Sequence, residues 1–479
     1  MRSIKQVCFV LAPIAAFVGC SEPEAGRTLT PVAHGTEPDH DGVPIIDRVP
    51  ASKNMTLVST LDFGSTEPLA FGDISVHKKH AYLGGYECGH GIHVANVTQP
   101  NNPVALPEFG GHPETNAEDV VAISMQTPHF TGDVLVAGLQ ARCGDGSGLR
   151  GLELWDVTTP AAPALLGFYD VVYGGGVHEL FVFKRNHRVY VLALAILSEA
   201  SAIEQGVSPA PGDVRIIDIT DPRHPVQVSD WGAREDAGLQ VGDDLFGPPC
   251  TDGTPTCRWV NSGGYPATFG HSGSVSNDGK TAYIAYWDAG MIILDIKNLA
   301  QPRFVGRGKV PNGQEGDLHS AIVMPRFNDT IAITTDEDFS PPFNTEGETD
   351  DIWGYMRIWS LNIPSFPIQL GKFATPHSKQ NRTDGTYAVH NPVAVGPLVF
   401  LSWYTDGIRV LDLSVPVIPR EIAYHEAPTK LAGPSGPETW TVTGFWGLDV
   451  KLPYVYASDF QRGLFIFKVA PSVENAATH

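Results

Sequence analysis

The sequence has few of the residues that build long helices. Among 479 residues there are 6 methionines and 6 cysteines, and no long stretch is rich in Ala, Leu, Glu and Lys. Glycine and proline are abundant instead, with 50 and 39 residues. Because both residues favour tight turns, this composition is typical of many short strands. We therefore expect an all-β chain.

Positive charge is also scarce. The chain has 32 Lys and Arg against 53 Asp and Glu, a net charge of −21, and its basic residues form no stripe. An acidic surface repels phosphate backbones, so we exclude nucleic acid as a partner.

Familiar catalytic motifs are missing as well. There is no Gly-x-Ser-x-Gly, phosphate-binding loop, His-Glu-x-x-His or EF-hand loop. The acidic stretch Asp336-Glu-Asp338 offers oxygen atoms to calcium but lacks the spacing of a calcium loop, so it predicts a solvated loop.

The first 20 residues predict export. Arg2 and Lys5 precede an apolar run at 7–18 that is too short to span a bilayer. The segment ending at Cys20 resembles a bacterial lipobox, with Phe17 where Leu is usual, so we expect cleavage and lipidation at Cys20. Ordinary secretion with loss of Cys20 is the alternative. Residues 21–54 are polar and rich in Pro and Gly, which predicts a flexible tether.

Four further cysteines, an even number, suit disulfides in an oxidising compartment. Cys250 and Cys257 bracket a short loop, and Cys88 and Cys143 occupy equivalent places in consecutive repeats. No Cys-x-x-Cys spacing supports a metal site, so we predict disulfides.

A short apolar strand pattern recurs seven times. Each copy is β-branched or aromatic and too short for a helix, and five copies precede a Pro-x-x-Pro turn. The copies lie at 91–97, 151–157, 213–219, 290–296, 355–361, 407–413 and 463–469. Three more strands accompany most copies, which predicts a seven-bladed β-propeller of four-stranded antiparallel blades over 55–470.

The two ends of the repeat region complement each other. The last unit stops after its third strand, before a tail at 471–479, and an orphan strand at 55–61 resembles a missing fourth strand. Pairing the orphan with the last blade would close the ring and remove two exposed edges.

A family resemblance follows from these repeats. The segments Val214-Arg-Ile-Ile-Asp218 and Ile408-Arg-Val-Leu-Asp412, each before a proline turn, resemble the LVIVD repeats of bacterial surface and secreted proteins. The resemblance extends over 55–469. It implies the propeller fold and export, and it is silent on activity.

One position in the first strand of each unit forms a column around the ring. It holds Ala70, Glu118, His178, His271, His319, His390 and Trp446. First strands line the channel of a propeller, and neutral imidazole binds copper or zinc. The column therefore predicts a metal site made by the four histidines and Glu118, with Glu179 and Asp119 orienting these ligands. Alternatively, the histidines merely bond water or backbone in a polar channel.

A second resemblance concerns one blade. The segment from Gly270 to Trp287 is similar to the selenium-binding protein family, which includes copper-dependent methanethiol oxidases with histidines at a propeller channel. The resemblance implies a metal near His271. The cysteine motifs of that family are absent here, so the reaction does not carry over.

These observations support two main hypotheses. The first is an exported binding module of the cell envelope. As a lipoprotein it would lie at the outer membrane, in the periplasm or at the cell surface, and without lipid it would be secreted. Its partner would be an envelope or extracellular protein, a glycan or a small ligand. The second is a metal-dependent oxidoreductase or hydrolase that uses the channel histidines; a purely structural envelope protein is a third. Metal content discriminates between them.

Overall fold

The computed structural model describes residues 51–65, 67, 69–144, 146–239, 269–310, 316–338, 353–380, 385–427 and 444–478. The predicted export signal with Cys20, almost all of the predicted tether, and the predicted Cys250–Cys257 pair lie outside the described residues.

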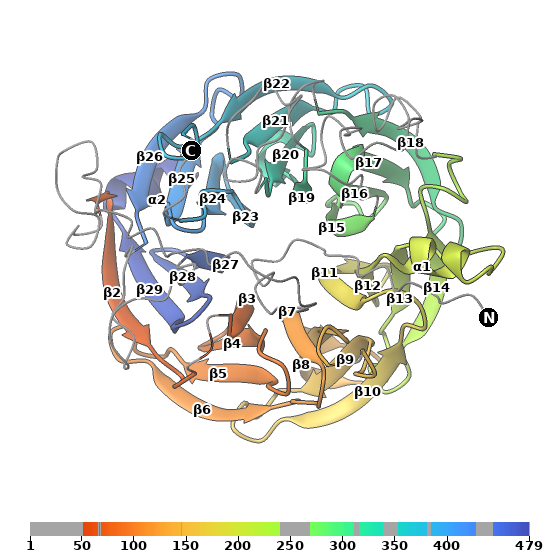
Figure 1. Ribbon diagram of the computed structural model, residues 1–479. Coiled ribbons are helices and arrows are strands. Elements are labelled where there is room, and N and C mark those ends of the chain that lie inside the picture. Colours follow the sequence, from red (N-terminus) through yellow and green to blue (C-terminus); the bar gives the residue numbers. More distant parts are fainter. Residues whose placement is uncertain are drawn as a thin grey trace, which may run out of the picture.

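The described strands form seven four-stranded antiparallel units arranged around one axis, as Figure 1 shows. Blades 1 to 3 consist of β3 (Phe71–His77), β4 (His80–Gly85), β5 (Ile92–Asn96) and β6 (Val104–Phe109); β7 (Asn116–Gln126), β8 (Thr131–Gln140), β9 (Gly151–Asp156) and β10 (Ala164–Asp170); and β11 (Gly176–Arg185), β12 (Arg188–Ile196), β13 (Val214–Asp218) and β14 (Val226–Trp231). Blades 4 and 5 consist of β15 (Gly270–Val275), β16 (Thr281–Tyr286), β17 (Gly290–Asp295) and β18 (Arg303–Gly308); and β19 (Leu318–Val323), β20 (Ile331–Asp336), β21 (Met356–Ser360) and β22 (Ile368–Phe373). Blades 6 and 7 consist of β23 (Pro392–Val395), β24 (Leu398–Ser402), β25 (Ile408–Asp412) and β26 (Arg420–His425); and β27 (Phe445–Lys451), β28 (Tyr454–Asp459), β29 (Gly463–Val469) and β2 (Met55–Leu61).

The ring closes through the first and last parts of the repeat region. Strand β2 pairs antiparallel with β29, with Met55 opposite Val469 and Leu61 opposite Leu464. The innermost strands contact one another in sequence order, and β27 contacts β3. The predicted closed propeller, sealed by an N-terminal strand, is therefore confirmed.

Apolar faces of neighbouring blades form the core. Between blades 3 and 4, Leu192 and Ile216 pack in one cluster with Ile284 and Ile292, and all four are buried. These residues alternate along the central strands of each blade, which places them on the faces that meet the next blade. Burying one such side chain contributes roughly 1.5–3 kcal/mol.

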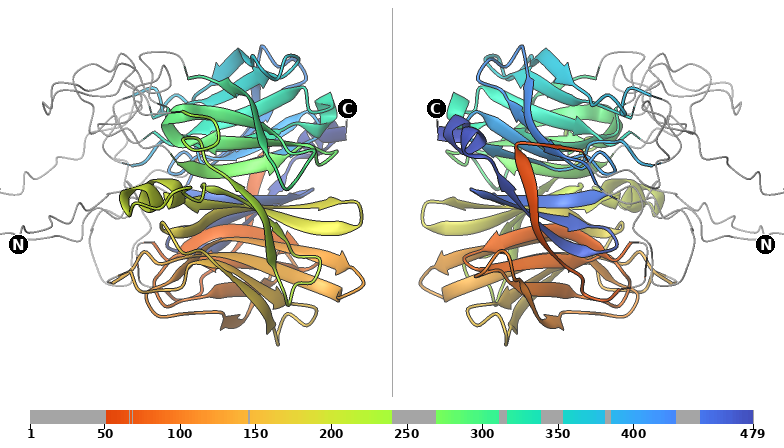
Figure 2. Two further views of the ribbon diagram at one scale, coloured as in Figure 1. Left: turned by 90° about the vertical axis from the view of Figure 1, so that its right-hand side faces the viewer. Right: turned by 90° about the vertical axis from the view of Figure 1, so that its left-hand side faces the viewer.

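The propeller extends beyond the predicted boundaries. Strand β1 (Ser52–Lys53) pairs with β26, so pairing begins before residue 55. The predicted tail forms helix α2 (Pro471–Thr478), whose Val473 joins the core of blades 6 and 7. Helix α1 (Ser198–Glu204) and α2 lie on opposite faces of the disc (Figure 2). Neither of these described helices has the length and apolar character of a membrane span.

Candidate metal centre

Strand bulges direct the predicted histidines. In blades 3, 4 and 5, one extra residue interrupts the register between the first and second strands, and it is His178, His271 or His319. A bulge bends the strand and re-aims the side chain of its extra residue. In blade 6, His390 lies two residues before β23, and its N–H donates to the carbonyl of Ser402.

The register corrects one member of the predicted column. In blade 1 the bulge follows Phe71, so Gly72 is the equivalent of His178, whereas Ala70 lies before the strand. A side chain cannot replace this glycine, because its Cβ would lie 2.5 Å from the carbonyl oxygen of Glu118. Glu118 and Trp446 occupy the bulges of blades 2 and 7, as the column predicts.

The four histidines form a continuous arc of buried rings. The Nε2 atoms of His178 and His271 lie 2.8 Å apart. Ring centroids are separated by 4.3 Å between His271 and His319, and by 3.8 Å between His319 and His390. All four side chains are buried. The structure thus brings together all four histidines that the sequence predicts to bind metal.

Hydrogen bonds fix the orientation of two rings. Nδ1 of His390 donates to the carbonyl oxygen of Trp446 at 2.9 Å. Nδ1 of His319 lies 2.7 Å from Oγ of Ser320, which donates to Asn391 at 2.9 Å. Since the serine proton is committed to Asn391, the imidazole must be the donor. Each ring then presents the lone pair of its Nε2, and neither Nε2 atom has a hydrogen-bond partner among the described residues.

The predicted carboxylates lie behind the arc of rings. Glu118 contacts Nδ1 of His178, on the side of the ring away from His271, and the side-chain amide of Gln140 lies 2.6 Å from the same nitrogen. Asp119 accepts the N–H of Leu180 at 2.7 Å, just beyond the bulge of blade 3. A group beside Nδ1 fixes the orientation of the ring, and Nε2 of His178 then faces Nε2 of His271. This is the position of an orienting group for Glu118.

Sequence reasoning missed Glu337. Its Oε2 lies 4.0 Å from Nε2 of His319, and its Oε1 lies 3.9 Å from Nε2 of His390. His271, His319 and Glu337 offer ligand atoms that all lie within 4.8 Å of one another, and this buried group could hold a metal ion. Glu179 also faces His319, with Oε1 4.0 Å from its Nε2.

The predicted solvated loop at Asp336–Asp338 is wrong, because all three acidic side chains are buried. Asp336 pairs with the fully buried Arg357, and the hydroxyl of Tyr404 bonds to Glu337. The available signal was the place of Glu337, directly after β20 in the same blade as His319.

Burial governs the charges at the centre. It holds the pKa of each of the four histidines well below the usual value, so the imidazoles are neutral near pH 7. Burial raises the pKa of Glu118 to about 8, and burial together with the charge of Glu118 raises that of Asp73 to about 7. Burial likewise raises the pKa of Glu337 and Glu179 well above the usual range. A cation would favour the charged forms of these acids.

Aromatic side chains continue the wall at the histidine end of the channel. Trp446 packs against His390 with ring centroids 4.3 Å apart, and against Tyr86 at 5.2 Å. The guanidinium of Arg142 lies 5.0 Å from the ring centre of Tyr86. The disulfide Cys88–Cys143 joins these neighbouring loops of blades 1 and 2, which confirms that predicted pair.

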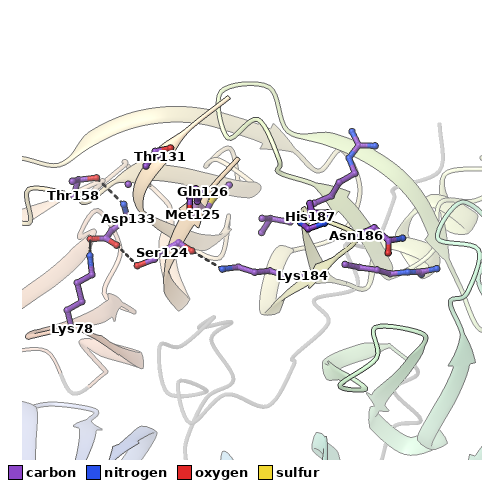
Figure 3. Close-up of a pocket in the computed structure, with 14 residues that line it drawn as sticks. Lys78, Ser124, Met125, Gln126, Thr131, Asp133, Thr158, Lys184, Asn186 and His187 are labelled. Atoms are coloured by element: carbon purple, nitrogen blue, oxygen red, sulfur yellow. Dashed lines mark hydrogen bonds and ion pairs between the residues drawn. The ribbon is translucent and has the colours of Figure 1, made fainter. Parts of the chain in front are cut away.

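A hollow of about 740 Å³ lies at the opposite end of β11 from His178, where the β11–β12 turn meets blade 2 (Figure 3). Its basic side chains already tie blades together. Lys78 bonds to Asp133 at 2.6 Å, Lys184 to the carbonyl of Ser124 at 2.9 Å, and Arg185 to that of Ile296 at 2.8 Å. We therefore assign this hollow to contacts between blades.

The fold and the arc of histidines define a seven-bladed β-propeller with a candidate metal centre in its channel. The family model of the LVIVD repeat matches residues 269–309, which comprise blade 4. Blade 4 is therefore an LVIVD repeat. The likeness to selenium-binding proteins stays a prediction.

Similarity to solved structures concerns the fold alone. The chain is similar to Raptor from Chaetomium thermophilum, with a TM-score of 0.50 and 9% identity over 88% of this chain and 29% of that one. The chain thus spans under a third of the length of that relative. It is also similar to the computationally designed protein Ika8, with a TM-score of 0.45 and 13% identity over 86% of this chain and 99% of that one. No curated protein sequence matches the chain.

Proposed function

We propose that the protein is an exported propeller that binds a transition-metal ion, copper or zinc, in its channel and uses it to hold a ligand or partner in the cell envelope. The ligands in this proposal are Nε2 atoms of His178, His271, His319 and His390. Neutral imidazole suits copper and zinc, and copper(II) binds more tightly under the usual order of affinities.

One observation carries the proposal. His319 and His390 each have Nδ1 committed to an outward hydrogen bond, and each buries an Nε2 atom that lacks a described hydrogen-bond partner. A buried polar atom left unpaired costs about 1–3 kcal/mol. A metal ion between these rings would remove that cost.

Charge balance also supports a cation. Four neutral imidazoles leave the charge of a divalent ion undiminished, and the carboxylates of Glu337 and Glu179 lie 4.0 Å from Nε2 of His319. These acids would compensate the charge at short range without displacing a histidine. Glu118 would orient His178 rather than bind the ion.

Metal analysis of the full chain, purified without added metal or chelator, tests the proposal. We expect the H271A and H319A variants each to lose about one transition-metal ion per chain relative to the native protein. H224A is the matched control, because His224 is exposed and pairs only with an aspartate on a surface turn. Equal metal content in all four proteins would overturn the proposal.

Catalysis is the second candidate. The hydroxyl of Tyr404 bonds to Glu337, so an acid–base pair adjoins the proposed ion. A metal ion can activate water or polarise a substrate, and such a pair can move protons beside it. Oxygen uptake and ester hydrolysis by the metal-loaded protein test this candidate. Turnover that disappears in both H319A and E337Q would establish an oxidoreductase or hydrolase, and its absence would leave the binding function.

Export and lipid attachment are part of the proposal. They rest on the apolar run at 7–18 and on Cys20. Mass spectrometry of the mature N-terminus tests them: a lipid-modified Cys20 supports membrane attachment, whereas a later N-terminus indicates release as a secreted protein.

A further inference from the structure

A second group of histidine and glutamate side chains lies away from the channel histidines, in blade 1. His90 comes from the β4–β5 loop, His93 from β5 and Glu108 from β6. Their ligand atoms all lie within 4.8 Å of one another. We propose that these three residues bind a zinc ion.

The distances in this group match the spacing of ligands around one ion, and the longest hydrogen bond among them joins Nδ1 of His90 to Glu108. Oε2 of Glu108 lies 3.3 Å from Nδ1 of His90 and 3.6 Å from Nδ1 of His93. Hydrogen bonds to a carboxylate are usually shorter, about 2.7–2.9 Å for charged donors. Two ligands bound to a tetrahedral zinc at 2.0–2.2 Å are about 3.3–3.6 Å apart, which is the edge of the tetrahedron.

Other contacts aim the same atoms inward. The N–H of Gly91 donates to Oε1 of Glu108 at 2.8 Å, which leaves Oε2 for the histidines. Glu87 lies 3.5 Å from Nε2 of His90, and its other oxygen accepts the hydroxyl of Ser65 at 2.9 Å. A carboxylate beside Nε2 orients the ring of His90 so that its Nδ1 faces Glu108.

Burial differs across the group in a way that suits a site at the surface. The side chain of His93 is 9% exposed and packs against Phe71, with centroids 4.9 Å apart, whereas His90 is 45% exposed. One rigid ligand and an open edge are typical of zinc sites with three protein ligands, which keep a fourth position for water.

The site would brace the loop that leads to the channel. The disulfide Cys88–Cys143 holds this loop two residues before His90, and Tyr86 at its start packs against Trp446. A zinc ion would add a second link between the loop and strands β5 and β6.

Zinc titration of the metal-free full chain, by calorimetry and equilibrium dialysis, tests the proposal. We expect E108Q to weaken one class of zinc binding by about 10–100-fold or more. The glutamine retains an acceptor for the N–H of Gly91, so the loop can keep its conformation. H90A changes a half-exposed side chain and serves as a second variant that should fold normally.

Two further variants separate the possible outcomes. H224A alters an exposed histidine paired with Asp221 and should bind zinc like the native protein. H319A alters the channel site and should retain the class of binding that E108Q and H90A lose. Native-like zinc binding by E108Q and H90A would overturn this inference, as would an equal loss in H224A. Failure of the channel proposal would instead appear as unchanged metal binding in H319A.

Discussion

Replacing Ser320 by alanine gives a direct test of how the channel histidines are held. Oγ of Ser320 accepts a hydrogen bond from Nδ1 of His319 at 2.7 Å, and its hydroxyl donates a hydrogen bond to Oδ1 of Asn391 at 2.9 Å. The amide of Asn391 donates to both oxygens of Asp73, at 2.7 and 2.8 Å. The variant S320A would leave a buried Nδ1–H without its acceptor and break this chain at its centre.

The structure sets the size of the effect. A buried donor that loses its acceptor costs about 1–3 kcal/mol of unfolding free energy. Loss of a group that orients a metal ligand lowers metal affinity by about 10–100-fold. Urea unfolding of the metal-free protein measures the first quantity, and competition with a chromogenic chelator measures the second.

Matched controls come from the neighbouring blade and from the conservative substitution. Ser274 in β15 is 3% exposed, and its hydroxyl has no hydrogen-bond partner among the described residues. We therefore expect S274A to change stability by no more than about 0.5 kcal/mol and to leave metal affinity unchanged. S320T keeps a hydroxyl and should restore much of both. If S320A and S274A behaved alike, the proposed orienting role of Ser320 would be refuted.

Two further predictions concern the scaffold. Despite the opposing effect of burial, Lys78, His77 and a serine hydroxyl hold the pKa of Asp133 at about 2. A depressed carboxylate pKa stabilises the folded state above the unfolded value and loses this effect as the pH falls. D133N should therefore lower the free energy of unfolding by about 1–2 kcal/mol at pH 7, after allowance for the exposed side chain of Lys78. The difference between D133N and the native protein in urea unfolding should shrink below about pH 4. A constant difference down to pH 3 would contradict the ion pair. M55A should lower the free energy of unfolding by about 2–5 kcal/mol, because Met55 is buried where β2 closes the ring. Leu57 on the same strand is 43% exposed, so L57A should cost far less. Equal thermal stability of the two variants would contradict closure by this strand.

The fold was predictable from sequence because each blade repeats the same local pattern. Apolar third strands such as 407–413 end at proline turns. The orphan strand at 55–61 has no partner nearby in the sequence, and the last repeat strand at 463–469 lacks a fourth-strand neighbour, so the two pair with each other. The column of histidines followed from the same repetition. Short additions were not predictable, because β1 and α2 lie outside the repeat and gain stability only by docking on blades 6 and 7.

The carboxylates of the centre were harder to predict, because their environment comes from other blades. Glu337 sits in an acidic stretch that would normally be solvated, but Tyr404 of blade 6 covers it. Gly72 replaced Ala70 in the column, since a bulge adds a residue that sequence spacing does not reveal. The blade 1 site has a local signal in the spacing of His90 and His93, although placing Glu108 beside them requires the β5–β6 register.

Departures from the repeat determine where a metal ion can sit. Blade 1 has no side chain at the column position, because the backbone of blade 2 leaves no space for one on Gly72. Blade 7 places Trp446 there, whose ring packs on His390 and Tyr86. The four channel histidines come from blades 3 to 6, so an ion bound by them would lie close to those blades. Trp446 and Tyr86 continue the channel wall beyond His390, and we expect a ligand of the centre to approach from that side.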